Sequence, residues 1–234
     1  MVTRWTIALT YNDDFYLHRF KGGLLKALSE AGHSVYAIAP AGESVEVIEN
    51  LGATFVDLPL DTGTSEDKGG YAKAQDETFY ARQREMMSRV VAASHVVITT
   101  ALIPGRPAPV LITEKMVSNM RPGSVIVDQA AETGGNCELT RPGETTVEHG
   151  VTIVGPVNLP STVPQDASQM YSKNIVSFLR EIMEGGAIRL DLEDEVVRET
   201  LVTYGGEVVH LRVRELLGMP AMTGDHHPVS VKES

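Results

Sequence analysis

The chain has 234 residues, of which 42% are hydrophobic and 22% charged, an ordinary globular composition that excludes disorder and collagen-like repeats. Lys and Arg total 20 against 31 Asp and Glu, so the formal net charge of −11 disfavours nucleic acid and anionic membranes as partners. The single cysteine, Cys137, excludes an internal disulfide, and no apolar run approaches the roughly 20 residues that span a bilayer. We therefore expect a cytoplasmic protein.

The first sixty residues alternate short apolar runs with helical patterns. Three β-branched runs predict buried strands at 5–10, 34–39 and 54–58. Between them, apolar residues at helical spacing predict a helix over 15–28, with capping residues just before it, and a shorter helix over 43–50. This order implies parallel strands joined by helical crossovers.

The polar stretch Pro59–Gly70, rich in turn formers, interrupts this alternation and predicts a mobile surface loop. The pattern then resumes with helices over 74–93 and 167–184 and a short helix capped by Thr113. Buried strands are expected at 95–100, 124–128 and 151–155. Short strands are expected at 188–192, 196–204 and 207–209, followed by a helix over 212–217.

Six buried strands separated by crossovers predict an α/β fold, a doubly wound Rossmann-like parallel sheet with strand order 3-2-1-4-5-6. We expect one nucleotide-binding domain over residues 1–184, a small C-terminal β/α extension over 185–219 and a flexible tail over 220–234. In such sheets, ligands bind beyond the carboxyl ends of the strands, where the order reverses between strands one and four. The loops that follow the strands there are the predicted site.

The turn after the first strand lacks the glycines of a dinucleotide-binding fingerprint. A G-x-G-x-x-G turn lets the backbone approach a pyrophosphate, which sits on the helix N-terminus. Here the turn is TYNDDF, with no glycine and two carboxylates, Asp13 and Asp14, that repel a pyrophosphate. The second strand ends in Ala39 and Pro40 rather than in the acidic residue that binds the adenosine ribose. The first half therefore lacks both standard NAD anchors.

Other reactive side chains have structural explanations. No histidine lies near Cys137 in the sequence, so we expect a small semi-buried side chain there rather than a nucleophile. Asp13 and Asp14 are expected to cap the helix that follows them. His226 and His227 are adjacent in the tail, and the other histidines are scattered, so no metal site is expected.

Long segments of the second half resemble the α subunit of NAD(P) transhydrogenase. They are GGYAK at 69–73, TTALIPGRPAP at 99–109, SVIVDQAAETGGNCELTRPGE at 124–144 and HGVTIVGPVNLPS at 149–161. The segment LEDEVVRETLVTYGGEVVH at 192–210 is similar as well, so the resemblance covers about residues 68–219. Alanine dehydrogenases share the fold but match these segments less closely.

Residues 1–61 resemble a different family, at the start of a GT-B glycosyltransferase N-terminal domain. This resemblance rests on DDFYLHRFKGGLLKALSEAGHSVYAIAPAGE and LGATFVDLPLD, at 13–43 and 51–61. His18 and Arg19 match that family's His-Arg pair, although a pair on a helix surface is the favoured explanation. Together, the two resemblances predict a chimaera joined near residues 61–68, natural or engineered.

The transhydrogenase resemblance implies NAD(H) as the cofactor. The segment GGYA belongs to a mobile loop that closes over bound NAD(H) in that family, and Gly70 and Tyr71 match its nucleotide-contacting positions. Gln83 and Leu102 match further NAD-contacting positions. Tyr71 offers an aromatic face and a hydroxyl, but an ordinary exposed tyrosine is the alternative. No catalytic residue is implied, because the nicotinamide rings perform hydride transfer.

Two functions stay open at this point. The first is an NAD(P) transhydrogenase α-like nucleotide-binding protein, which supports hydride transfer between NAD(H) and NADP(H) only with partner components. Those partners are NADP-binding and membrane components, and the resemblance also implies a homodimer. The alternative is a non-catalytic or glycosyltransferase-like Rossmann binding module that has lost its NAD site.

Overall fold

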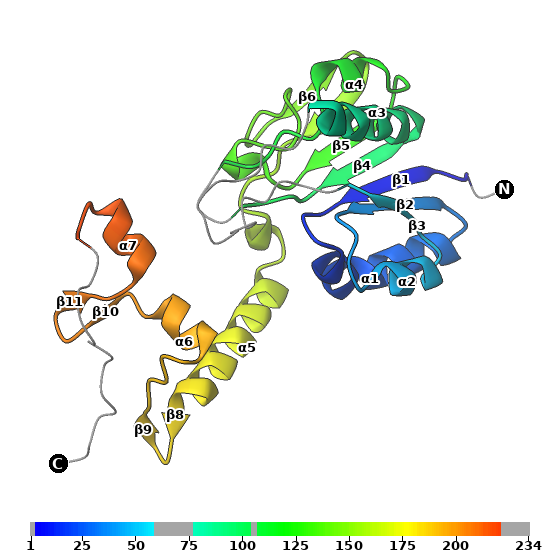
Figure 1. Ribbon diagram of the computed structural model, residues 1–234. Coiled ribbons are helices and arrows are strands. Elements are labelled where there is room, and N and C mark those ends of the chain that lie inside the picture. Colours follow the sequence, from blue (N-terminus) through cyan, green and yellow to red (C-terminus); the bar gives the residue numbers. More distant parts are fainter. Residues whose placement is uncertain (1–2, 59–76, 104–106, 221–234) are drawn as a thin grey trace. The chain divides into compact units, whose positions relative to one another are not determined.

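The computed structural model describes residues 3–58, 77–103 and 107–220, with the side chains of one helix described only from residue 85. The chain divides into two compact units, Met1–Leu159 and Pro160–Ser234, which are described separately. Figure 1 shows a central sheet with helices in the first unit, and helices with short hairpins in the second.

The first unit is built on a seven-stranded sheet in the order β3-β2-β1-β4-β5-β7-β6. The strands are β1 (Thr6–Thr10), β2 (Ser34–Ala39), β3 (Thr54–Asp57), β4 (Val96–Thr99), β5 (Val125–Asp128), β6 (Thr145–Glu148) and β7 (Val151–Val154). All neighbours are parallel except β6 and β7, which form an antiparallel pair. The predicted doubly wound sheet is confirmed, with β1 beside β4, and the sixth predicted strand is β7. The strand β6 was not predicted, because its Thr and Glu residues at the sheet edge carry little hydrophobic signal.

Helices cover the two faces of this sheet. They are α1 (Asp14–Glu30), α2 (Val45–Asn50), α3 (Glu77–Ala93) and α4 (Glu114–Ser118), with a 3₁₀ turn η1 (Ala131–Thr133). Figure 1 shows α1 and α2 on one side of the strands and α3 and α4 on the other. Residues at strand positions two apart point to the same face, so a parallel sheet needs apolar cover on both sides.

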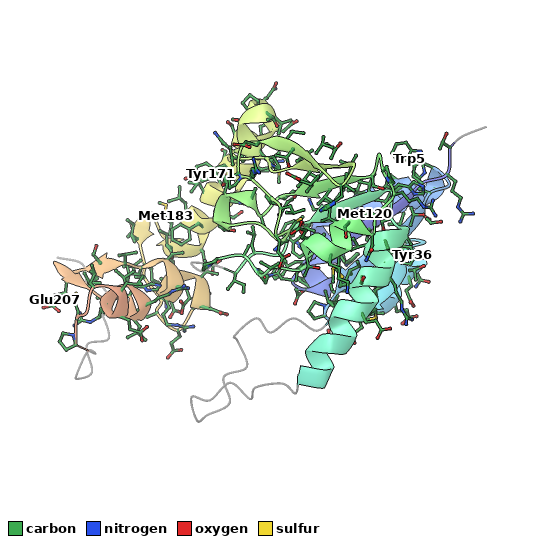
Figure 2. All side chains as sticks on the ribbon, turned by 90° about the horizontal axis from the view of Figure 1, so that it is seen from above. Trp5, Tyr36, Met120, Tyr171, Met183 and Glu207 are labelled. Carbon is green, nitrogen blue, oxygen red and sulfur yellow. The ribbon has the colours of Figure 1, made fainter. Side chains whose placement is uncertain are left out.

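Two apolar clusters hold these layers together. One joins Leu17 and Leu25 of α1 and Ile48 of α2 to the strands, including Leu9 of β1. The other joins α3 and α4 to the opposite face of β1, β4, β5 and β7, through residues such as Val91 and Val117. Met120 and the partly buried Tyr36, both labelled in Figure 2, belong to this second layer. Both halves of the sequence therefore share one sheet.

The second unit contains one long helix and several short elements. They are η2 (Leu159–Thr162, across the boundary), α5 (Pro164–Ile182), β8 (Met183–Glu184), β9 (Ala187–Ile188), α6 (Glu195–Thr200), β10 (Thr203–Tyr204), β11 (Glu207–Val208) and α7 (Leu211–Leu216). Each strand pair is a two-residue hairpin closed by a Gly-Gly turn with positive φ.

The expected strand over 196–204 is mostly wrong, because α6 occupies its first part. Asp194 caps this helix by accepting a hydrogen bond from the Val197 N–H at 2.9 Å. The cap and the polar residues between the valines outweigh the β-branched preference for a strand. The expected strand over 188–192 is also shorter than predicted, since β9 ends at Ile188.

The observed division between the units falls before α5, whereas we expected the nucleotide-binding domain to end at residue 184. Ile182 is the only buried side chain of α5, so this helix adds little to the sheet's core. The assignment of residues 1–184 to a single domain stays a prediction. The expected mobile loop at 59–70 and the tail from residue 221 lie outside the described residues. Within the part that is described, no helix combines the length and apolar character needed to cross a bilayer.

Candidate functional site at the switch point

Polar side chains line the sheet edge where the strand order reverses. Thr10 of β1 pairs with Thr99 of β4, which pairs in turn with Asp128 of β5, so these side chains form one row on the same face. The Thr99 hydroxyl donates to Asp128 Oδ1 at 3.0 Å, and the Thr100 hydroxyl donates to the Thr10 carbonyl at 2.7 Å. The Thr10 hydroxyl is buried and has no hydrogen-bond partner among the described contacts. Water or a ligand group is needed to satisfy it.

The turn between β1 and α1 is closed by side chains of the turn itself. Asp13 is the N-cap of α1 and accepts a hydrogen bond from the Tyr16 N–H at 3.1 Å, as the sequence predicted. Asn12 Nδ2 donates to the Leu102 carbonyl at 3.2 Å. This bond joins the loops after β1 and β4 across the switch point, so Leu102 lies at the predicted place.

Asp14 acts differently from the expected helix cap. It is 4% exposed, and its Oδ2 accepts a hydrogen bond from the Ser44 N–H at 2.8 Å. A Cβ on Gly42 would meet Asp14 Oδ1 at 2.4 Å, so the loop after β2 lies directly against this carboxylate. Asp57 Oδ1 holds the same loop through the Ala41 N–H at 3.0 Å. Carboxylates of the chain thus occupy the surroundings of the first turn.

Asp128 organises the loops on the other side of the switch point. Its side chain is fully buried and accepts five hydrogen bonds. Besides Thr99, the donors are the N–H groups of Ala130, Asn136 and Cys137 and the hydroxyl of Thr140, at 2.6 to 3.1 Å. A carboxylate with this many donors is stabilised in its charged form even without water.

Asn136 extends this network to the loop after β4. Its Oδ1 accepts from the Ala101 N–H at 3.0 Å, and its Nδ2 donates to the carbonyls of Ala101 and Pro109 at 2.9 and 2.8 Å. Asn136 is also fully buried. One amide therefore connects three loop segments, and a buried network with all partners present fixes their shape.

Glycines permit the close approaches in these loops. Gly135 has a φ of 86°, and a Cβ there would meet Asp128 Oδ2 at 2.8 Å. At Gly155, directly after β7, a Cβ would meet the Arg141 carbonyl oxygen at 2.4 Å. The backbone can therefore wrap around Asp128 only because these positions lack side chains.

Two groups near the site have raised pKa values. Burial is the main cause for the Cys137 thiol, and the nearby Asp128 charge raises its pKa further. Cys137 is 1% exposed, more deeply buried than expected, and its raised pKa disfavours the reactive thiolate. Burial also raises the pKa of Tyr11.

The four predicted NAD-contacting residues are placed only in part. Leu102 is exposed beside the switch point. Gly70 and Tyr71 lie outside the described residues, and Gln83 lies in α3 at a position whose side chain is not described. In the described ranges, no group of three or more His, Cys, Asp or Glu side chains is arranged to hold a metal ion.

Asp128 and Asn136 were missed as structural determinants of the site. The signal was present, because an acidic residue ends a buried strand and a Gly-Gly pair and an asparagine follow it within eight residues. Such a short polar loop after a buried strand has few other ways to satisfy its backbone groups.

The two sides of the switch point differ in how well they fit a dinucleotide. At the first turn, the Asp13 and Asp14 carboxylates and the loop held by Asp14 do not fit a pyrophosphate, because like charges repel. On the β4 and β5 side, the exposed Leu102 and the unpaired Thr10 hydroxyl leave room for a neutral hydrogen-bonding group. The fit to NAD is therefore partial and favours weak binding.

Comparisons with known proteins identify relatives over most of the chain. The family model "Alanine dehydrogenase/PNT, C-terminal domain" matches residues 25–211. An NAD(P) transhydrogenase subunit alpha of Rhodospirillum rubrum is 43% identical over 206 residues, which cover 86% of this chain and 51% of that protein. The NAD(P) transhydrogenase subunit alpha of Haemophilus influenzae is 38% identical over 211 residues, 88% of this chain and 41% of that protein.

Solved structures agree with this assignment. The transhydrogenase from Sinorhizobium meliloti superposes with a TM-score of 0.67 at 32% identity, over 89% of this chain and 55% of that one. An L-alanine dehydrogenase shares the fold, with a TM-score of 0.63 at 21% identity, over 92% of this chain and 53% of that one.

The matched residues bear on the predicted chimaera. The family model begins at residue 25, inside the segment 1–61 that resembles a glycosyltransferase, and so includes much of that segment. The glycosyltransferase resemblance stays a prediction. The chain spans about half the length of the curated relatives it matches. It belongs to the alanine dehydrogenase/PNT C-terminal domain family.

Proposed function

We propose that this chain is a nucleotide-binding component of an NAD(P) transhydrogenase-type oxidoreductase, with weak affinity for NAD(H). The observation that carries the proposal is 43% identity to a transhydrogenase α subunit over most of the chain. The switch-point geometry supports it, because the loops after β4 and β5 are held rigidly by Asp128 and Asn136. A preorganised loop loses little entropy when a ligand binds.

The proposed role of the protein is to bind and orient the cofactor. Bound nicotinamide supplies the hydride chemistry, so no catalytic acid or base is needed from this chain. Gly70, Tyr71, Gln83 and Leu102 are the proposed contacts. Leu102 presents an exposed side chain beside the crevice, while its carbonyl is engaged by Asn12.

Hydride transfer between NAD(H) and NADP(H) is proposed only in the presence of partner components, one that binds NADP(H) and one in the membrane. Two nucleotide sites are required, and the sheet of the first unit has one switch point. We also propose a homodimer and a cytoplasmic location for this component.

A non-catalytic or glycosyltransferase-like Rossmann module is the second candidate. The observation in its favour is the first turn, where Asp13 caps α1 and Asp14 holds the loop after β2. In this account, residues 1–61 derive from a glycosyltransferase and the chain has lost its NAD site.

Titration with NADH, followed by its fluorescence, separates these functions. Saturable binding with a Kd below roughly 100 μM supports the transhydrogenase component, and binding at or below about 1 μM contradicts the proposed weak site. No saturation up to about 1 mM supports the second candidate.

The Tyr71→Phe variant tests the inherited loop. Loss of one hydrogen bond is expected to weaken NADH binding by about 0.5–1.5 kcal/mol without lowering the melting temperature. Tyr171→Phe, at an exposed position of α5, is the matched control and should leave the affinity unchanged. Equal affinities for Tyr71→Phe and the unsubstituted protein exclude a hydrogen-bonding role for the Tyr71 hydroxyl.

A further inference from the structure

Helix α1 exposes a cluster of stacked aromatic rings. Phe15, Tyr16 and Phe20 are 51%, 48% and 61% exposed. The Tyr16 and Phe20 rings are nearly parallel with centroids 5.9 Å apart, and Phe15 packs edge-on against Tyr16 at 5.4 Å. Leu24, one helical turn after Phe20, is also exposed. Contiguous apolar surface of this kind marks an interaction site more often than a single exposed residue does.

Gly23 lies on the same stripe of α1 as these side chains. Residues three and four apart share a helix face, so Tyr16, Phe20, Gly23, Leu24 and Ala27 form one line. A Cβ on Gly23 would meet nothing within 4 Å. A glycine inside a helix costs about 0.5–1 kcal/mol relative to alanine. Packing within this chain therefore gives no reason for a glycine at this position.

Charges along α1 are arranged asymmetrically. Arg19 and Lys26 flank the apolar stripe, whereas Glu30 ends the helix. Lys26 and Glu30 form an exposed ion pair at 3.8 Å, which contributes little and is easily exchanged. The first half of the exposed face is thus basic, and its end is acidic.

We propose that this face of α1 is the surface on which two copies of the chain associate, as an antiparallel helix pair crossing at Gly23. A two-fold axis there brings the two glycines together and lets the backbones approach closely. It places Lys26 of one copy opposite Phe20 of the other, a cation–π arrangement. Glu30 then lies near Tyr16 and Arg19 of the second copy, so opposite charges meet.

The alternatives fit the same face less well. A parallel pair would bring Lys26 against Lys26 and Glu30 against Glu30, and like charges repel. An anionic membrane would meet a protein with a formal net charge of −11. A helix pair buries less area than a standard interface of about 1,200–2,000 Å², so the dimer is reversible. The inference rests on the proposed self-association and is independent of nucleotide binding.

Sedimentation equilibrium over a concentration series tests the surface. The unsubstituted protein is expected to show a reversible monomer–dimer equilibrium, and Phe20→Glu should weaken the association at least tenfold. Val147→Glu is the matched control, because Val147 is an exposed valine on the edge strand β6, and it should leave the dimer unchanged. Circular dichroism confirms that each variant is folded.

A charge exchange tests the antiparallel register. Arg19→Glu should weaken the dimer, and adding Glu30→Arg should restore it. A protein that is monomeric at every concentration overturns both the surface and the proposed homodimer. A dimer that Phe20→Glu leaves unchanged overturns the α1 surface alone, and failure of Glu30→Arg to restore association overturns the register. NADH affinity is measured separately, so none of these outcomes depends on the nucleotide site.

Discussion

The two sides of the switch point use carboxylates in opposite ways. Asp128, beside β4, is fully buried and accepts five hydrogen bonds from the loops around it. Asp14, beside β1, is almost as buried, but its side chain accepts one hydrogen bond among those described, from the Ser44 N–H. The first carboxylate builds a rigid loop framework, whereas the second holds a neighbouring loop against the place where a phosphate would bind.

This difference shows that burial alone does not indicate what an acidic residue does. The number and origin of its donors decide whether it stabilises the fold or excludes an anion. The comparison can be broken or sharpened by substitutions on each side.

The largest effect is expected from Asp128→Ala. This change leaves three N–H groups and two hydroxyls without their acceptor in a buried site, so we expect a loss of at least about 3 kcal/mol in the free energy of unfolding. Urea unfolding measures it. Asp57→Ala removes a single exposed acceptor on the β1 side and should cost about 1 kcal/mol. Similar losses for the two variants would contradict the comparison.

Gly155→Ala is expected to have the next largest effect. Its Cβ would meet a backbone oxygen at 2.4 Å, which the structure can relieve only by moving the loop, at a cost of about 1–3 kcal/mol. On the other side of the sheet, Gly23→Ala meets open space and should stabilise α1 by about 1 kcal/mol. Thermal unfolding at low protein concentration compares the two. A neutral Gly155→Ala would show that the loop after β7 is not tightly packed.

Asp14→Asn probes the excluded anion directly. Asparagine keeps an oxygen for the Ser44 N–H but removes the charge, so NADH should bind about fivefold more tightly, or about 1 kcal/mol. Asp191→Asn, at an exposed position in the second unit, serves as the control and should not change the affinity. Tighter binding in both variants would point to net charge rather than to the first turn.

The smallest effect concerns Cys137. Burial raises the pKa of its thiol above that of the unfolded chain, so ionisation favours the unfolded state. This contribution to stability is complete below the unfolded pKa and is lost as the pH rises through the folded pKa. We expect negligible labelling by a thiol reagent in the native state and rapid labelling in urea. Fast native labelling would mean that the loop around Asp128 opens readily.

Much of the fold was predictable because the apolar runs are unambiguous. SVYAIA became β2 with the predicted bounds, and Thr113 caps α4 by accepting from the Met116 N–H. The pairing of β1 with β4 followed from crossover topology. The strand β6 and the helix α6 were not predicted, since edge pairing and a capping bond are decided by contacts rather than by hydrophobic period.

The candidate site was predictable in position but not in detail. The switch-point rule located the loops, and the carboxylates of the first turn were visible in TYNDDF. That Asp14 would turn toward Ser44, and that Asn136 would join three loop segments, depends on distances of 30 and 35 residues along the chain. Local patterns carry no information about such contacts.

The central claim is that any bound nucleotide contacts the loops after β4 and β5 rather than the first turn. Amide chemical-shift mapping of the ¹⁵N-labelled protein during NADH titration tests it most directly. The largest shifts are predicted at Ala101, Leu102 and Ala130, with small shifts at the amides of Tyr16 and Ser44. Largest shifts at Tyr16 and Ser44 would contradict the account, because they would place the phosphates at the turn that Asp13 and Asp14 are proposed to close.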